Sequence, residues 1–186
     1  MWHVLEKNRV LKDEKSLPPK QRDIYSVWKL LVAENGPSIL RTQEAKWHDH
    51  ALQGNLSDYR SSWLGSSNWR VVYQIATDEE NVVGVEKLGK HSDVYRKNSS
   101  TSRPREPVRF RDDGPWYPSS EVDMTAGEIL VVMREIYGMS QEELSSRADI
   151  SQSNLSAIER GRIGLGVQRA RRIADAFGVS PGVFLR

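Results

Sequence analysis

A dense run of helix start and stop signals between residues 124 and 186 constrains the fold of this chain more than any other feature. Thr125 with Glu128, and Ser140 with Glu143, each form a capping box, in which a hydroxyl and a carboxylate satisfy free N–H groups at a helix start. Glycine stop signals follow, at Gly138, Gly161 and Gly178. The pattern predicts helices at about 126–137, 140–147, 151–159 and 167–177, and Ser180 with Pro181 opens a short last turn.

The two short helices at 140–147 and 151–159 are joined by only a few residues, which predicts a helix-turn-helix rather than a purely structural bundle. Amides and hydroxyls on the outer face of the second helix suit the edges of bases in a major groove. Arg162, just past the helix end, is better placed for phosphate. The predicted DNA-binding residues are Gln141, Ser151, Gln152, Ser153, Asn154, Ser156 and Arg162.

The stretch "SQEELSSRADISQSNLSAIERG" resembles the Xre/lambda-repressor-like family, in particular the HigA-type antitoxins. The resemblance implies a DNA-binding domain that represses its own promoter. Asp149 stands where the family usually has Gly in a left-handed turn, and Asp is one of the few residues that tolerate that conformation. A homodimer is left open as a partner state, and a dimer would require a palindromic operator.

Residues 1–98 have a different pattern and predict a small α+β domain. Two N-terminal helical stretches are separated by Leu17-Pro18-Pro19. After residue 57 the hydrophobic period changes to two, and "DYRSSWL", "NWRVVYQI" and "NVVGVEKL" predict three strands. Because their connections are short, an antiparallel meander is expected. The predicted fold class is therefore α+β followed by an all-α helix-turn-helix domain.

Composition supports a boundary between the two halves. All nine Lys lie at or before Lys97, whereas residues 124–186 contain eight Arg and no Lys. Residues 99–123, rich in Ser, Pro and Arg, are predicted to be a linker between domains at 1–98 and 124–186. The linker contains four apolar residues, Val108, Phe110, Trp116 and Tyr117, which suggest that it contacts the first domain. Its segment "PVRFR" is expected to add a strand to the sheet of that domain.

The candidates for chemistry in the first domain lie in "WHDHALQGNLSDYR" and "GKHSDVYR". His titrates near neutral pH and can move protons, while Arg and Lys stabilise negative charge, so these residue types suit RNA cleavage without a metal. Three alternatives are open. His48, Asp49 and His50 could form a metal site together with His91. His48 could instead be an ordinary surface residue, and Trp69 could belong to the core. No metal or cofactor is predicted, and with no Cys a thiolate site is excluded.

The same stretches resemble the RelE/ParE toxin superfamily, closest to its HigB and YafQ branches. The resemblance implies ribosome-dependent cleavage of mRNA, with His50, Trp69, His91 and Tyr95 as catalytic residues. Phosphate contacts are implied for a second group, Arg60, Arg70 and Lys90. Two positions depart from the YafQ branch, with Trp63 in place of a further His and Asn68 in place of an Asp.

Together the halves predict a fused toxin–antitoxin protein, in which the DNA-binding domain restrains an mRNA-cleaving domain in cis. Its expected partners are mRNA on the ribosome and operator DNA. The alternatives are a DNA-binding regulator whose toxin-like domain only senses a ligand, and a ParE-like gyrase inhibitor. No stretch reaches the length of a membrane span, and Met1-Trp2-His3 lacks the basic-then-apolar order of a signal peptide. The absence of Cys suits the cytoplasm.

Overall fold

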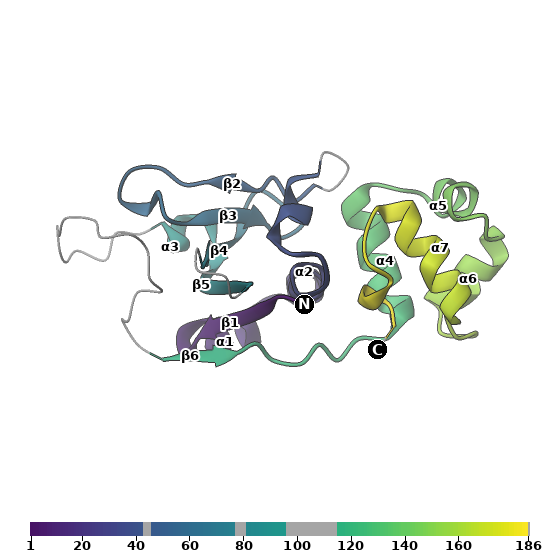
Figure 1. Cartoon of the computed structure of the whole chain (residues 1–186), viewed down its shortest axis with the longest axis horizontal. Helices are drawn as coiled ribbons and strands as arrows, with labels where there is room; N and C mark the ends of the chain where they lie inside the picture. The colour runs from purple at the N-terminus through teal and green to yellow at the C-terminus, as the bar shows by residue number, and fades with distance from the viewer. Residues whose placement is uncertain (43–45, 77–80, 96–114, 186) are drawn as a thin grey trace.

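The computed structural model describes residues 1–42, 46–76, 81–95 and 115–185, and it divides into an α+β domain and a helical domain (Figure 1). The predicted fold class is confirmed. The α+β domain contains a sheet in the order β2-β3-β4-β5-β1-β6. The bounds of the strands are β1 His3–Lys7, β2 His50–Ala51, β3 Arg60–Trp63, β4 Trp69–Ile75, β5 Val82–Lys90 and β6 Trp116–Pro118.

The predicted meander is present, since β3, β4 and β5 pair antiparallel in chain order. Strand β1 was not predicted. It lies beside β5 in parallel register, with Val4 opposite Val83. The chain between these two strands contains α1 (Asn8–Ser16), α2 (Pro19–Asn35) and strands β2 to β4. The segment "HVLEK" does not show the alternation of apolar and polar residues that predicts a strand. Two of its buried residues, Glu6 and Lys7, are charged.

The linker contributes the sixth strand. Strand β6 pairs antiparallel with β1, and the Trp116 ring lies 4.2 Å from the Lys7 ammonium. The predicted contact of Trp116 and Tyr117 with the first domain is therefore confirmed. The predicted strand in "PVRFR", with Val108 and Phe110, lies outside the described residues.

A buried polar network fixes the chain just after β6. Glu6 Oε1 accepts a hydrogen bond of 2.5 Å from the Tyr25 hydroxyl, and Lys29 Nζ donates to Glu14 at 2.8 Å. Lys29 also donates to Ser120 Oγ at 2.7 Å, and the Ser120 N–H donates to Glu6 Oε2. Strand β1, both helices and the linker thus meet at one cluster of hydrogen-bonded charges.

The second domain has the helices predicted from its caps: α4 Ala126–Tyr137, α5 Gln141–Ala148, α6 Gln152–Glu159, α7 Val167–Phe177 and the turn η3 Pro181–Val183. Both capping boxes are formed, and Asp149 takes the predicted left-handed conformation at φ 51°. Gly127 allows close packing of α4 on α6, because a Cβ there would lie 2.3 Å from the Ile158 carbonyl oxygen.

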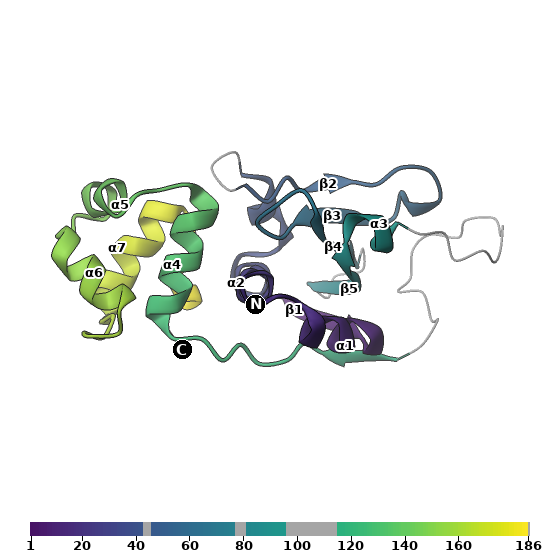
Figure 2. The same ribbon diagram turned by 180° about the vertical axis from the view of Figure 1, so that it is seen from behind.

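Helix α2 packs between the sheet and the second domain (Figures 1 and 2). Most of its residues from Ile24 to Val32 are buried, which a helix with only one covered face does not show. The Ser180 N–H donates to Asn35 Oδ1 at 2.6 Å, and Lys20 pairs with Glu135 at 2.8 Å. Buried residues of both domains form one continuous hydrophobic cluster.

Candidate functional site

Two of the predicted catalytic residues are connected through strand β3. His50 on β2 lies opposite Ser61 on β3, and the Ser61 hydroxyl accepts a hydrogen bond of 2.7 Å from the Tyr95 hydroxyl. The Tyr95 ring makes an edge contact with His91, with 4.8 Å between ring centroids. His50 and His91 are both exposed. The fold therefore places two titratable side chains at the surface on either side of a Ser61–Tyr95 hydrogen bond.

The predicted phosphate ligand Arg70 lies in the same part of the sheet. It is only 6% exposed, and its guanidinium carbon is 5.0 Å from the centre of the Trp63 ring. Burial lowers the pKa of Arg70, whereas its interaction with Tyr95 acts in the opposite direction. Within the described residues, Arg70 Nε has no hydrogen-bond partner. Arg70 is thus a largely buried cation whose Nε is shielded from solvent and lacks an acceptor in the described residues.

His48 and Trp63 complete this surface, and the residue pattern alone gave no signal for their contact. The His48 ring stacks on Trp63 with 3.7 Å between centroids, and the residue has a positive φ of 46°. The His48 carbonyl oxygen is 2.9 Å from His50 Nδ1. Trp63, which replaces a His of the YafQ branch, therefore contacts His48 on one side and Arg70 on the other.

Arg60, a predicted phosphate contact, is paired with a buried carboxylate. The Asp49 carboxylate, whose side chain is fully buried, accepts from Arg60 Nε at 2.9 Å and from Arg60 Nη2 at 2.5 Å. It also accepts from Ser62 at 3.0 Å and from the Tyr73 hydroxyl at 2.7 Å. Burial raises the pKa of Tyr73, and the neighbouring Asp49 raises it further. These contacts fix the chain immediately before His50.

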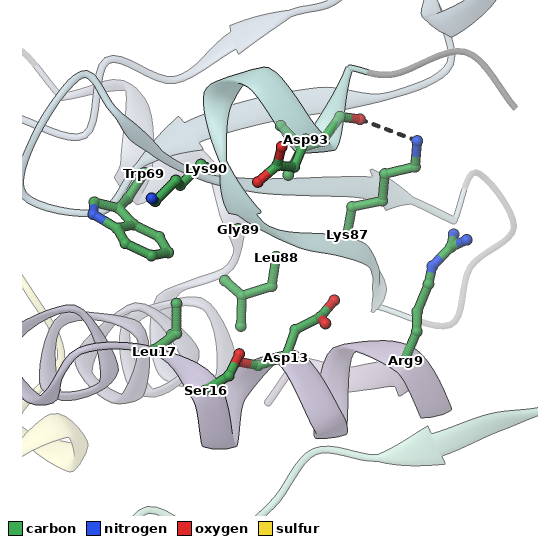
Figure 3. Close-up of a pocket in the computed structure, with 11 residues that line it drawn as sticks. Arg9, Asp13, Ser16, Leu17, Trp69, Lys87, Leu88, Gly89, Lys90 and Asp93 are labelled. Carbon is green, nitrogen blue, oxygen red and sulfur yellow. Dashed lines mark hydrogen bonds between the residues drawn. The ribbon is translucent and has the colours of Figure 1, made fainter.

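Trp69 and Lys90 lie at one end of a groove between α1 and α3 (His91–Val94), shown in Figure 3. Lys90 Nζ is 5.9 Å from the centre of the Trp69 ring, and the His91 N–H donates to the Asn68 carbonyl at 2.7 Å. Trp69 also packs against the main core, so the predicted core role accounts for part of its surface. The remainder is available to a ligand in the groove.

The predicted DNA-binding residues divide into exposed and engaged side chains. Gln152, Ser153, Asn154 and Arg162 are exposed, and α6 lies at the end of the molecule away from the α+β domain (Figure 1). Ser151 caps α6 by accepting from the Asn154 N–H at 3.3 Å.

Two other predicted DNA contacts have partners within the fold. Gln141 donates its amide to Glu159 at 2.6 Å, and Glu159 also pairs with Arg134 at 2.9 Å. Ser156 accepts a hydrogen bond from Arg160. Gln141 and Ser156 therefore have structural contacts that compete with a role at a base edge.

Among the described residues, no three His, Asp or Glu side chains converge as ligands for a metal. Within the same ranges, every helix is too short or too polar to cross a bilayer.

The fold and these surfaces define a two-domain protein, an α+β domain followed by a helix-turn-helix domain. Residues 133–184 match the model of the helix-turn-helix family HTH_3. This match confirms the resemblance of the second domain to the Xre-type helix-turn-helix family. No curated protein matches the chain.

The α+β half is similar to three solved structures of the toxin group that the sequence resembles. YafQ from E. coli strain BL21(DE3) is 18% identical over 51% of this chain and 99% of its own, with a TM-score of 0.37. The archaeal RelE–RelB complex from Pyrococcus horikoshii OT3 is 19% identical over 50% and 97%, with a TM-score of 0.38. The YoeB/ParE toxin from Agrobacterium tumefaciens is 17% identical over 48% and 98%, with a TM-score of 0.36.

Proposed function

We propose that the protein joins a metal-independent endoribonuclease, which cleaves mRNA on the ribosome, to a domain that binds the operator of its own promoter. The observation that carries the first part is the placement of exposed His50 and His91 beside buried Arg70 and the Tyr95–Ser61 hydrogen bond. Sequence motifs that resemble RelE/ParE toxins support the same reading.

The chemistry needs one group to accept the proton of the 2′-hydroxyl and another to protonate the leaving 5′-oxygen. His50 and His91 supply these two roles. The attacking oxygen forms a bond to phosphorus while the bond to the 5′-oxygen breaks, and negative charge accumulates on the phosphoryl oxygens. Arg70 stabilises that charge, since a cation in a partly buried site acts more strongly than one in water.

The helix-turn-helix domain restrains the catalytic site without covering it. In the described residues, the contacts between the domains involve α2, α4 and η3, and none of them covers His50, His91 or Tyr95. One contact reaches the segment that carries the histidines: the Lys46 N–H donates to the Ile136 carbonyl at 3.3 Å. Restraint would then act by altering the position of residues 46–50.

Cleavage of ribosome-bound mRNA by the full-length protein tests the catalytic proposal. His50→Ala and His91→Ala are each expected to reduce the cleavage rate by about 10²- to 10⁴-fold. Lys12→Ala, an exposed change on α1, serves as the control. Full cleavage by the double His variant would exclude the assignment.

A DNA-binding regulator with an inactive toxin-like domain is the second candidate, favoured by Trp63 in place of the further His. DNA damage instead of RNA cleavage would indicate a gyrase inhibitor.

A further inference from the structure

The groove between α1 and α3 has a composition that nothing in the proposed mechanism explains. It encloses about 500 Å³, within the range of pockets that hold small ligands. Its wall on α1 is made of residues spaced along one helix face, and its floor is apolar, with Leu88 and Gly89 of β5. The wall residues are Arg9, Asp13 and Ser16 of α1, followed by Leu17 at its C-cap.

The two ends of the groove differ. Trp69 closes one end with an aromatic ring, and Lys90 lies beside it (Figure 3). At the other end the cations have partners in the protein: Arg9 Nε donates to the Glu86 carbonyl at 2.7 Å, and Lys87 donates to the Val94 carbonyl at 3.0 Å. The end at Trp69 is therefore the one that offers an aromatic face and a cation to a ligand.

Asp13 points from α1 into the groove (Figure 3). Its side chain accepts no hydrogen bond from the described residues, although Arg9 is near enough to lower its pKa. Burial has the larger effect and raises the pKa of Asp13. A half-buried carboxylate oxygen without a donor favours a ligand that supplies an N–H group.

We infer that this groove binds one unpaired base of RNA, and that Asp13 selects an amino-bearing base, cytosine rather than uracil. Unpaired bases are recognised in RNA by stacking on aromatic side chains and by hydrogen bonds to their edges. A carboxylate accepts from the N4 amino group of cytosine, whereas uracil has a carbonyl oxygen at that position, which the carboxylate repels. Lys90 is placed to hold an adjoining phosphate, and His91 follows it directly in the chain. The inference rests on the proposed RNA-binding role of this domain.

Binding of short RNAs to the full-length protein tests the selection without requiring cleavage. Fluorescence anisotropy with labelled oligo(C) and oligo(U) hexamers, at about pH 7, compares two bases of nearly equal size. Oligo(C) is expected to bind at least about ten-fold more tightly. Asp13→Asn, which replaces an acceptor oxygen by an NH₂ donor, is expected to reduce that preference to within about three-fold.

A control variant locates the effect in the groove. Asp23→Asn makes the same chemical change at an exposed position of α2 outside the groove. It is expected to retain the preference for oligo(C). If Asp13→Asn does not fold, as judged by circular dichroism, Asp13→Ser takes its place, since it also removes the carboxylate.

The outcomes separate this inference from the proposed catalysis. Equal binding of the two hexamers, or a preference that survives Asp13→Asn, overturns the base selection even if ribosome-bound mRNA is cleaved. A preference that depends on Asp13 supports the inference even if no mRNA is cleaved, in which case the catalytic proposal alone fails.

Discussion

The two domains bury different kinds of side chain. Every buried polar or charged residue in the described part of the chain belongs to the α+β domain, including Glu6, Lys29 and Arg70. The core of the helix-turn-helix domain is apolar and aromatic, and the carboxylates of its two capping boxes lie at exposed helix starts. Glu159, which pairs with Arg134 at the end of α6, is the exception. One domain therefore depends on long-range polar contacts, and the other on local caps around an apolar core.

The shared helix α2 shows where this contrast ends. Lys20 and Asn35, at the two ends of the helix, both contact the second domain, and Val27 and Leu31 lie on the same helix face between them. Both are completely buried. The helix-turn-helix domain is thus part of the core of the first domain, which differs from a domain that is only tethered.

Leu31→Ala is expected to have the largest effect and to test that shared core. Removing a fully buried Leu side chain should lower the free energy of unfolding by about 4 kcal/mol. All six Trp lie outside residues 124–186, so Trp fluorescence reports on the first domain, and helical circular dichroism includes the second. In the variant, Trp fluorescence and circular dichroism should report unfolding at the same denaturant concentration, which should be lower than in the parent protein.

Leu155→Ala provides the complementary measurement, because Leu155 is completely buried within the helix-turn-helix domain. If the domains unfold together, this change should also shift the Trp transition. If the Trp transition of Leu155→Ala does not move, the two domains unfold independently. The shared helix α2 would then belong to the first domain alone in energetic terms.

Asp49→Ala tests the polar side of the comparison. It removes the acceptor of Arg60, Ser62 and Tyr73 and leaves a partly buried cation without its partner, which should cost about 3 kcal/mol of stability. Because the same contacts fix the chain before His50, RNA cleavage should also fall. Asp23→Ala, at an exposed position, is the control. Unchanged unfolding would mean that Arg60 finds other partners.

The sequence predicted the second domain more fully than the first because its signals are local. Each helix of 124–186 begins and ends within one or two residues of the predicted bounds, since its caps are residues in the chain next to it. In the first domain, β1 pairs with β5, which follows two helices and three other strands, and no local pattern indicates that partner. Burial of Glu6 depends on Lys29 and Ser120, and Ser120 lies 114 residues further along the chain.

The candidate site shows the same limit. Motifs indicated His50, Trp69, His91 and Tyr95, whose types suit the chemistry. The stacking of His48 on Trp63 and the burial of Asp49 under Arg60 and Tyr73 result from strand pairing, which residue types alone do not determine.

Gln152→Ala tests whether the exposed face of α6 reads bases. It should weaken binding to the specific operator by about 1–3 kcal/mol and relax the base preference, while stability changes little because the side chain is exposed. Arg162→Ala should weaken binding to all sequences alike and reduce the salt dependence. Operator footprints measure both effects. If protection of the protein's own promoter is absent, autoregulation is excluded.

The smallest effect concerns pH, and it has opposite signs in the two domains. Burial raises the pKa of Glu6, although Lys29 lowers it, so the folded state binds this proton more tightly than the unfolded state. Its contribution to stability is therefore present at low pH and is lost as pH rises through the folded pKa. Hydrogen bonds from Thr125 lower the pKa of Glu128, so its contribution is present above the unfolded pKa and is lost as pH falls.

Paired Gln variants, each measured by urea unfolding between about pH 7 and pH 4, separate these two contributions. Glu6→Gln removes the group that favours acid, so the variant should lose more stability on acidification than the parent protein. Glu128→Gln removes a group that favours neutral pH, so its stability should fall less. Glu121→Gln, at an exposed position before α4, should follow the parent. If both variants shift in the same direction, the buried network around Glu6 and the exposed cap at Thr125 do not respond to pH as opposites, and the contrast between the domains does not extend to their titration.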